Sequence, residues 1–192
     1  MKELRDKILT YGVGIGKDIV KVDLFLNHRI DTGLIFRMGE EFARAFSDDK
    51  PDTVLTVEAS GIALALTAAH ALGDVPVVFA KKAATVVQNQ DMLQAKVYSF
   101  THKQENTIRV DKRFLPAGSR VLIIDDFLAD GQASLGMIEL CKQADCEVVG
   151  VGIGIEKGFM PGGENLRQKG VKLVSLAVVT GIEDGHILLA DD

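Results

Sequence analysis

The sequence predicts an α/β protein with a mostly parallel, twisted sheet flanked by helices. From residue 53 onward, short apolar runs alternate with helix-like segments, a pattern typical of crossover units in a parallel sheet. The runs at 121–124 and 148–155 contain only apolar residues and glycine, as strands covered on both faces do. A chain of 192 residues can bury one sizeable core, so we expect a single domain over 1–192.

Composition limits the partners that the protein can have. A net charge of -5 argues against binding to nucleic-acid backbones, which usually requires a basic patch, but it does not exclude a small anionic ligand. No apolar stretch approaches the roughly 20 residues that span a bilayer, and the first residues lack a signal-peptide pattern. Cys141 and Cys146 fit no metal or redox motif, and Cys141 is interpreted as a core residue. We therefore expect no membrane association and a cytoplasmic location.

The N-terminal region is predicted to contain a helix, a connector and an extended run. Within 2–11, the residues Leu4, Ile8 and Tyr11 fall on one helical stripe. The glycines at 12, 14 and 16 follow no strand and lack phosphate-loop spacing, so they are interpreted as a flexible connector. Residues 19–29 are expected to be extended. Asp31 can cap the next helix, whose predicted buried stripe is Leu34, Ile35, Met38, Phe42 and Phe46.

The middle of the chain is predicted to hold a strand–turn–helix unit, a second strand and a long loop. The unit comprises a strand at 53–57, a turn at 58–61 and an alanine-rich helix at 62–72, and the second strand is 76–80. Lys81 and Lys82 then begin a weakly periodic stretch, 83–104. A loop of this length inside a compact domain is unusual and often functional, so we interpret it as a lid. Residues 108–110 are expected to return to the sheet edge.

The segment VLIIDDFLADGQA at 121–133 carries the strongest functional signal. Asp125 and Asp126 are expected to close its strand, and a loop at 127–130, Gly131 and a helix at 132–144 follow. In open α/β sheets ligands bind beyond the carboxyl ends of strands, and amides at a helix N-terminus favour phosphate. Carboxylates repel phosphate but accept hydrogen bonds from hydroxyls, so the pattern suggests a sugar phosphate. The alternative is that the acids only cap a solvent-exposed turn.

The C-terminal part is predicted to complete the sheet. The glycines at 150, 152 and 154 lie within a strand, so they do not match a dinucleotide-binding fingerprint and more simply allow close helix packing. Pro161 suits the first turn of a short helix that ends near residue 169. Segments 171–179 and 187–189 are expected to finish the sheet or to form an appended hairpin.

Several segments resemble one known family, in order along nearly the whole chain. VLIIDDFLADGQA is similar to the phosphoribosyl-diphosphate motif of type I phosphoribosyltransferases. The segments VDLFLNHRID, VEASGIA, VVFAKK, VYSFT and IEKGFMPG resemble the members of that family that act on xanthine. The resemblance implies a type I fold with a flexible lid and a small hood formed by about 1–30 and 156–192. It also implies conversion of xanthine and phosphoribosyl diphosphate to xanthosine monophosphate and diphosphate, in purine salvage.

The resemblance further implies roles for individual residues. Asp125 and Asp126 would be the catalytic acids that hold the ribose hydroxyls. Phosphoribosyl diphosphate would contact a set of turn and lid residues: Ala59, Ser60, Gly61, Lys81, Lys82, Tyr98, Ala129, Asp130, Gly131, Gln132 and Ala133. The base would lie against hood residues, namely Val20, Asn27, Phe127, Lys157 and Phe159, although both phenylalanines could equally be core residues. Mg²⁺ would be held mainly through the substrate diphosphate, with no metal site of protein ligands, and the enzyme would be a homodimer.

Asp130 departs from the family pattern. Many members have threonine at this position, and xanthine enzymes have asparagine. A third carboxylate would repel the sugar phosphate unless its side chain turns away to cap the helix. The expected recognition of the phosphate by backbone amides is unaffected.

Other classes share some of these features. A phosphoribosyl-diphosphate-sensing regulator would have the same fold, but residues 1–30 are too short and insufficiently basic for the DNA-binding segment that such regulators carry. An enzyme acting on guanine, hypoxanthine or adenine is the closer alternative, and the hood residues discriminate between these bases. A nucleotide-binding oxidoreductase is a distant alternative, because the glycines are misplaced for it.

Overall fold

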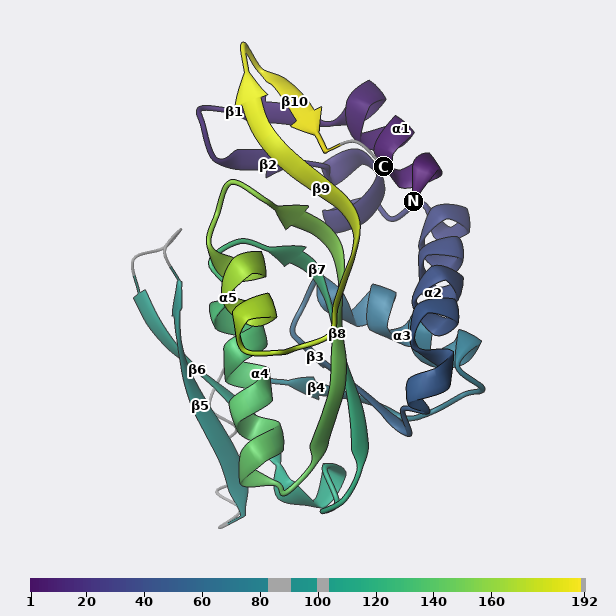
Figure 1. The fold of residues 1–192 in the computed structure, drawn as a ribbon, viewed down its shortest axis with the longest axis vertical. Helices are drawn as coiled ribbons and strands as arrows, with labels where there is room; N and C mark the ends of the chain where they lie inside the picture. The colour runs from purple at the N-terminus through teal and green to yellow at the C-terminus, as the bar shows by residue number, and fades with distance from the viewer. Residues whose placement is uncertain (83–90, 100–103, 191–192) are drawn as a thin grey trace.

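The computed structural model describes residues 1–82, 91–99 and 104–190. A six-stranded sheet with the order β10-β9-β8-β7-β3-β4 forms its centre (Figure 1). The strands are β3 (Thr53–Val57), β4 (Val77–Ala80), β7 (Arg120–Leu128), β8 (Glu147–Lys157), β9 (Leu173–Glu183) and β10 (His186–Leu189). All neighbouring pairs are parallel except β10 with β9. The predicted α/β class with a mostly parallel sheet is confirmed.

Helices cover both faces of this sheet. Helices α2 (Thr32–Phe46) and α3 (Gly61–Ala71) lie on one face, and α4 (Gln132–Gln143) and α5 (Gly162–Gln168) lie on the other (Figure 1). Along β7, Leu122 and Ile124 pack into the α2–α3 core, whereas Val121 and Ile123 pack into the α4 core. This alternation explains why the strand is apolar throughout.

The predicted buried stripe of α2 and the role of the strand glycines are confirmed. All five residues of the α2 stripe are buried, and Asp31 caps the helix by accepting a hydrogen bond from Leu34 N at 3.0 Å. A Cβ at Gly150 would lie 2.4 Å from Phe46 Cε1, so glycine in β8 is what lets α2 approach. Cys141 is buried in α4, where burial raises the pKa of its thiol to about 12 and keeps it an inert core residue.

The N-terminal segment differs from the prediction in three places. After α1 (Lys2–Tyr11), the expected connector is strand β1 (Val13–Ile15), which pairs with β2 (Ile19–Lys21). A Cβ at Gly14 would lie 2.4 Å from Ile182 Cγ2, so close approach to β9 explains its glycine. The extended run stops at β2, and a π-helical turn, η1 (Asp23–Asn27), buries two consecutive residues, which an alternating strand does not do. Tyr11 is 53% exposed and does not join the buried stripe.

The two ends of the chain meet at one end of the sheet. Gly14 N donates a hydrogen bond to Gly185 O at 3.0 Å, between the β1–β2 hairpin and the turn that joins β9 to β10. Figure 1 shows α1, β1, β2 and β10 gathered above the carboxyl ends of β7 and β8. We refer to α1, β1, β2, η1 and β10 as the hood.

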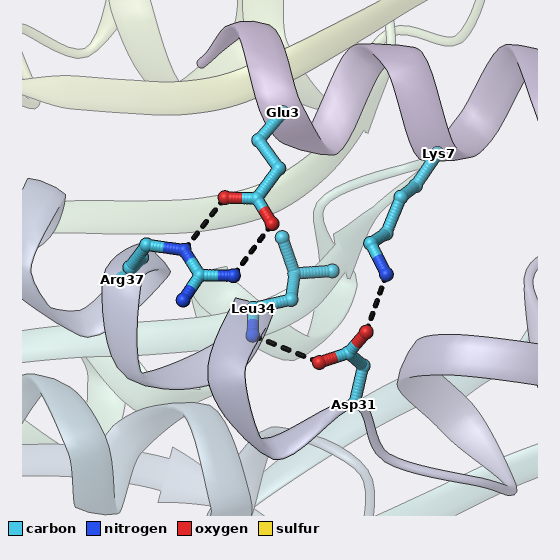
Figure 2. A network of polar contacts seen from close by, with 5 residues as sticks. All are labelled: Glu3, Lys7, Asp31, Leu34 and Arg37. Carbon is cyan, nitrogen blue, oxygen red and sulfur yellow. Dashed lines mark hydrogen bonds and ion pairs between the residues drawn. The ribbon is translucent and has the colours of Figure 1, made fainter.

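Polar contacts attach the hood to α2, as Figure 2 shows. The guanidinium of Arg37 donates two hydrogen bonds to the Glu3 carboxylate, each 2.6 Å long. The Lys7 ammonium pairs with Asp31, the residue that also caps α2. Two ion pairs, one of them to the residue that caps α2, therefore attach α1 to the N-terminal part of α2.

Part of the predicted lid at 83–104 is a β-strand. Residues 92–99 form β5 (Met92–Ser99), which pairs antiparallel with β6 (Gln104–Asp111), and the expected return at 108–110 meets the main sheet only through a bridge between Lys81 and Arg109. The buried side chains of Leu93, Ala95 and Val97 alternate along β5 and pack into the α4 core. Residues 83–90 and 100–103 lie outside the described part of the chain.

Short 3-10 turns, η2 (Ser47–Asp49) and η3 (Lys112–Phe114), complete the element order. Among the residues that the structure describes, no helix is long and apolar enough to cross a bilayer.

Candidate active site

Asp125 and Asp126 lie at the carboxyl end of the sheet, inside β7 rather than at its end. The strand continues to Leu128 because its pairing with β8 continues to Glu156, which corrects the predicted loop at 127–130. Both carboxylates are buried, with 5% and 6% of their residues' surface exposed. Asp125 Oδ1 accepts a hydrogen bond from Asp126 N at 3.0 Å. The exposed-turn alternative for this pair is therefore wrong.

The environment of Asp125 opposes its ionisation. Burial and the neighbouring charge of Asp126 raise its pKa well above the ordinary value, while the positive charge of Lys82 acts in the opposite direction. A Cβ at Gly61 would lie 2.8 Å from Asp125 Oδ1 and 2.4 Å from Thr56 Oγ1. Glycine at the start of α3 therefore leaves room for the Asp125 carboxylate.

Asn27 connects the hood to this acid pair. Its Nδ2 donates a hydrogen bond to Asp126 Oδ2 at 2.8 Å. The π-helical turn η1 presents the amide, and hydrogen bonds from Arg29 N to Asp23 O and from Asp31 N to Phe25 O, both 2.9 Å, hold the turn in place. Asn27 and Asp126 are 99 residues apart in the chain, yet the fold brings the predicted base side and the predicted ribose side into direct contact.

Lys157 ends β8 on the same side of the sheet. Its Nζ donates to Asp18 O at 2.7 Å and lies 5.9 Å from the centre of the Phe127 ring. Burial lowers the pKa of Lys157, and the negative charges of Asp18 and Asp130 oppose this effect. The lysine thus joins the hood hairpin, the end of β7 and the turn that leads into α4.

The turn at 129–133 leads into α4 with the predicted helix-terminus geometry. Gly131 has φ +84°, a left-handed conformation that favours glycine, and α4 begins at Gln132. The first amides of a helix lack partners within it, so they point out of this turn. Asp130 Oδ1 accepts from Gln132 N at 3.1 Å, so its side chain folds back onto the turn and occupies one of the amides predicted to bind the phosphate.

The turn at 58–61 lies between β3 and α3, and a cis peptide joins Glu58 to Ala59. Glu58 Oε1 accepts from Lys82 N at 2.5 Å, which ties this turn to the end of β4. The backbone of Lys81 bridges to Arg109, and its Nζ lies 5.9 Å from the Phe79 ring. Ala59, Ser60 and both lysines are exposed at this edge.

The remaining predicted site residues lie in different settings. Val20 is only 8% exposed and packs in the hydrophobic core, while Phe127 is partly buried against the same core. Phe159 is 37% exposed in the turn after β8, and Tyr98 is 40% exposed near the end of β5. The structure thus gives Val20 a packing role, whereas Phe159 and Tyr98 are only partly covered.

One buried polar cluster was given no role by the sequence interpretation. Glu156 is 3% exposed, and its carboxylate accepts hydrogen bonds from Arg167 and Ser175. The sequence signal was a glutamate at the end of an otherwise apolar strand, followed by the glycine pair at 162 and 163. Its partners come from α5 and β9, so their contact is set by the tertiary fold.

Comparison with known proteins agrees with this geometry. Residues 31–172 match the family model of the phosphoribosyl transferase domain. The chain belongs to the phosphoribosyltransferase family and has the type I fold.

Comparison with individual relatives points to one group within this family. The chain is 48% identical over 190 residues to a xanthine phosphoribosyltransferase of Lactococcus lactis subsp. cremoris (strain MG1363), covering 99% of this chain and 96% of the relative. It is 49% identical over 187 residues to a xanthine phosphoribosyltransferase of Geobacillus thermodenitrificans (strain NG80-2), covering 97% and 96%.

Solved structures share the fold at lower identity. An adenine phosphoribosyltransferase from Rhodothermus marinus has a TM-score of 0.74 at 23% identity, with 93% of this chain and 99% of that chain covered. One from Saccharomyces cerevisiae, complexed with an imino-altritol bisphosphate and adenine, has a TM-score of 0.71 at 22% identity, covering 92% and 99%.

Proposed function

We infer that the protein transfers the phosphoribosyl group of phosphoribosyl diphosphate to xanthine, producing xanthosine monophosphate and diphosphate. Curated xanthine phosphoribosyltransferases of nearly the same length, 48% and 49% identical, support this activity. The single structural observation that carries it is the hydrogen bond from Asn27 to Asp126. This bond places the Asn27 amide, which can bind the base, beside the Asp126 carboxyl, which can bind the ribose hydroxyls. A site that forms a nucleotide requires these two kinds of group side by side.

In the proposed reaction, the site binds the two ends of the donor separately. The carboxylates of Asp125 and Asp126 accept hydrogen bonds from the ribose hydroxyls, and the amides of the 129–133 turn bind the sugar phosphate. The 58–61 turn, with Lys81 and Lys82, binds the diphosphate that leaves. Positive charge develops on the ribose as the bond between the ribose and the diphosphate breaks. Most of the rate acceleration therefore comes from positioning the substrates and from neutralising the leaving diphosphate.

The base is proposed to lie between Asn27 and Lys157, with Phe159 or Phe127 against its ring. Asp126 Oδ2 accepts the hydrogen bond from Asn27 Nδ2 and thereby orients the amide. The amide then offers Oδ1 and its second N–H to the base. The cation of Lys157 complements the 2-oxo group that distinguishes xanthine from hypoxanthine.

Mg²⁺ is proposed as the cofactor, held mainly by substrate oxygens and water. The described part of the chain contains no cluster of three or more histidine, cysteine or acidic residues that could hold a metal ion. Mg²⁺ usually keeps several waters and binds through one or two carboxylates together with substrate phosphates, and the diphosphate supplies such oxygens. When bound, Mg²⁺ would neutralise charge on the leaving diphosphate.

We further propose that the protein works as a cytoplasmic homodimer in purine salvage, without nucleic-acid or membrane partners. An apolar hollow of about 590 Å³, lined by β4 on one side and by residues of β6 and η3 on the other, supports a second copy as partner. Phe79 and Phe114, 41% and 58% exposed, lie on its border. Sedimentation of the purified protein tests the dimer, and a monomer at micromolar concentration would refute it.

Product formation tests the proposed activity directly. The purified chain is incubated with phosphoribosyl diphosphate, Mg²⁺ and xanthine, and the nucleotide and diphosphate are quantified by chromatography. Equal amounts of xanthosine monophosphate and diphosphate are expected. Absence of nucleotide with xanthine, guanine, hypoxanthine and adenine would overturn the enzyme proposal and favour a regulator that only binds the donor.

A further inference from the structure

Glu156, near the end of β8, has a buried carboxylate for which the proposed reaction has no direct use. Its Oε1 and Oε2 each accept a hydrogen bond from the Arg167 guanidinium at 2.8 Å, and Oε2 also accepts from Ser175 Oγ at 2.5 Å. Burial raises the pKa of Glu156, but the hydrogen bonds from Arg167 and Ser175 outweigh it and leave the pKa below its usual range. The carboxylate is therefore ionised and doubly held at neutral pH.

Helix α5 depends on this carboxylate for its position. The helix is 7 residues long, too short to be stable without tertiary contacts. Arg167, in its last turn, binds Glu156, and Gly163, in its first turn, packs directly against the same side chain. A Cβ at Gly163 would lie 1.9 Å from Glu156 Oε1, so only glycine fits there. Both ends of α5 thus contact one glutamate.

The first turn of α5 also contacts the 129–133 turn. Gly162 N donates to Ala129 O at 3.0 Å. A Cβ at Gly162 would lie 2.5 Å from Ala129 O and 2.6 Å from Gly131 N, so the two backbones are in direct contact. A displacement of α5 would consequently displace the turn proposed to bind the sugar phosphate.

On its other side, Glu156 is followed in β8 by Lys157, whose Nζ is anchored on Asp18 O. We propose that Glu156 and Arg167 form a positioning clamp that fixes the 129–133 turn relative to Lys157. The clamp thereby fixes the distance between the turn proposed to bind the phosphate and the lysine proposed to bind the base. The clamp rests on the proposed function, and its residues touch neither substrate.

Removal of the charge of Glu156 tests the clamp. In Glu156→Gln the KM values for both phosphoribosyl diphosphate and xanthine are expected to rise about tenfold, with a smaller change in kcat, since small displacements of binding groups are costly. Arg167→Met, which removes the half-exposed partner, is expected to give the same pattern and serves where Glu156→Gln does not fold. Glu147→Gln is the control, because Glu147 pairs with Arg120 at the opposite end of β8. Its KM values should match those of the wild type.

A second variant separates positioning from general stability. Gly162→Ala forces α5 away from Ala129 and leaves the Glu156 and Arg167 side chains in the sequence, so its effect on KM should be non-additive with that of Glu156→Gln, which acts through the same helix. Full additivity would contradict the clamp. KM values within twofold of wild type in both Glu156→Gln and Arg167→Met, with a reduced free energy of unfolding, would overturn it and leave a structural role only.

Direct binding keeps this test independent of turnover. The affinity for phosphoribosyl diphosphate with Mg²⁺ is measured by calorimetry without base, and Glu156→Gln should weaken it about tenfold. A wild type that binds the donor but turns over no purine would refute the proposed function, while the clamp would still be decided by this affinity.

Discussion

Asn27 Nδ2 lies 2.8 Å from Asp126 Oδ2, and this hydrogen bond is the direct contact between the hood and the acid pair. Asp126 is only 6% exposed, so bulk water has little access to its oxygens. The bond both orients the Asn27 amide and occupies one oxygen of Asp126. Binding of base and binding of ribose are therefore expected to be energetically coupled.

Substitution of Asn27 should expose that coupling. In Asn27→Ala we expect the KM for xanthine to rise about tenfold, as for loss of one hydrogen bond to a charged or polar partner. Asn27→Asp should be worse, because it places a like charge beside Asp126. Initial rates over a grid of both substrate concentrations provide the measurement.

Lys2→Ala, an exposed change in helix α1 of the same hood, is the control for Asn27. Equal KM values in Asn27→Asp and the wild type would show that this amide is not part of the base site.

Asp125 is expected to lower the free energy of unfolding of the protein at neutral pH. Its folded-state pKa lies above the unfolded value of about 3.9, so the folded chain holds this proton more tightly and is penalised when the group ionises. Asp125→Asn removes the penalty, and the free energy of unfolding at pH 7 should rise by about 1 kcal/mol while activity is lost. The gain should shrink as the pH falls through the raised pKa and vanish below about 4.

Urea unfolding at several pH values measures this gain. Asp48→Asn, at an exposed acid in η2, should change stability by less than about 0.5 kcal/mol. A lower free energy of unfolding for Asp125→Asn than for the wild type at pH 7 would mean that the ionised carboxylate stabilises the fold.

Asp130 should weaken binding of the sugar phosphate. Its carboxylate folds back onto Gln132 N, yet it keeps a negative charge in the turn proposed to hold a phosphate. Asp130→Asn preserves the hydrogen bond and removes the charge, so the KM for phosphoribosyl diphosphate should fall about threefold to tenfold, an effect that added salt reduces. Kinetics at two ionic strengths measure it.

Asp145→Asn removes a carboxylate just after the opposite end of α4 and should leave this KM unchanged. An unchanged KM in Asp130→Asn as well would show that Asp130 exerts no repulsion on the donor.

The parts of the fold that follow from local pattern could be predicted from the sequence. Continuous apolar runs gave the strands of the parallel sheet, and the 3.6-residue period of Leu34 to Phe46 gave the face of α2. The acids and glycine of the 121–133 segment indicated where to look for the candidate site, because strand ends and helix starts are local features. Resemblance to a family then added the residues of the hood.

Features that depend on distant contacts could not be predicted. The glycine of β1 was interpreted as flexible, but it is required by the approach of Ile182, which is far away in sequence. Strand β5 carries alternating residues whose burial depends on α4, so its segment looked like an unstructured lid. The Glu156 cluster needs Arg167 and Ser175 from other elements, and no spacing rule brings these together.

The central claim is that the hood selects xanthine at the acid pair, and base selectivity tests it most directly. The ratio kcat/KM is measured for xanthine, guanine, hypoxanthine and adenine at saturating phosphoribosyl diphosphate and Mg²⁺, in the wild type and in Lys157→Gln. The wild type should prefer xanthine, and Lys157→Gln should lose about tenfold or more of that preference, the scale of one charge-assisted hydrogen bond. A wild type that prefers adenine, or a Lys157→Gln variant with undiminished preference for xanthine, would contradict the account.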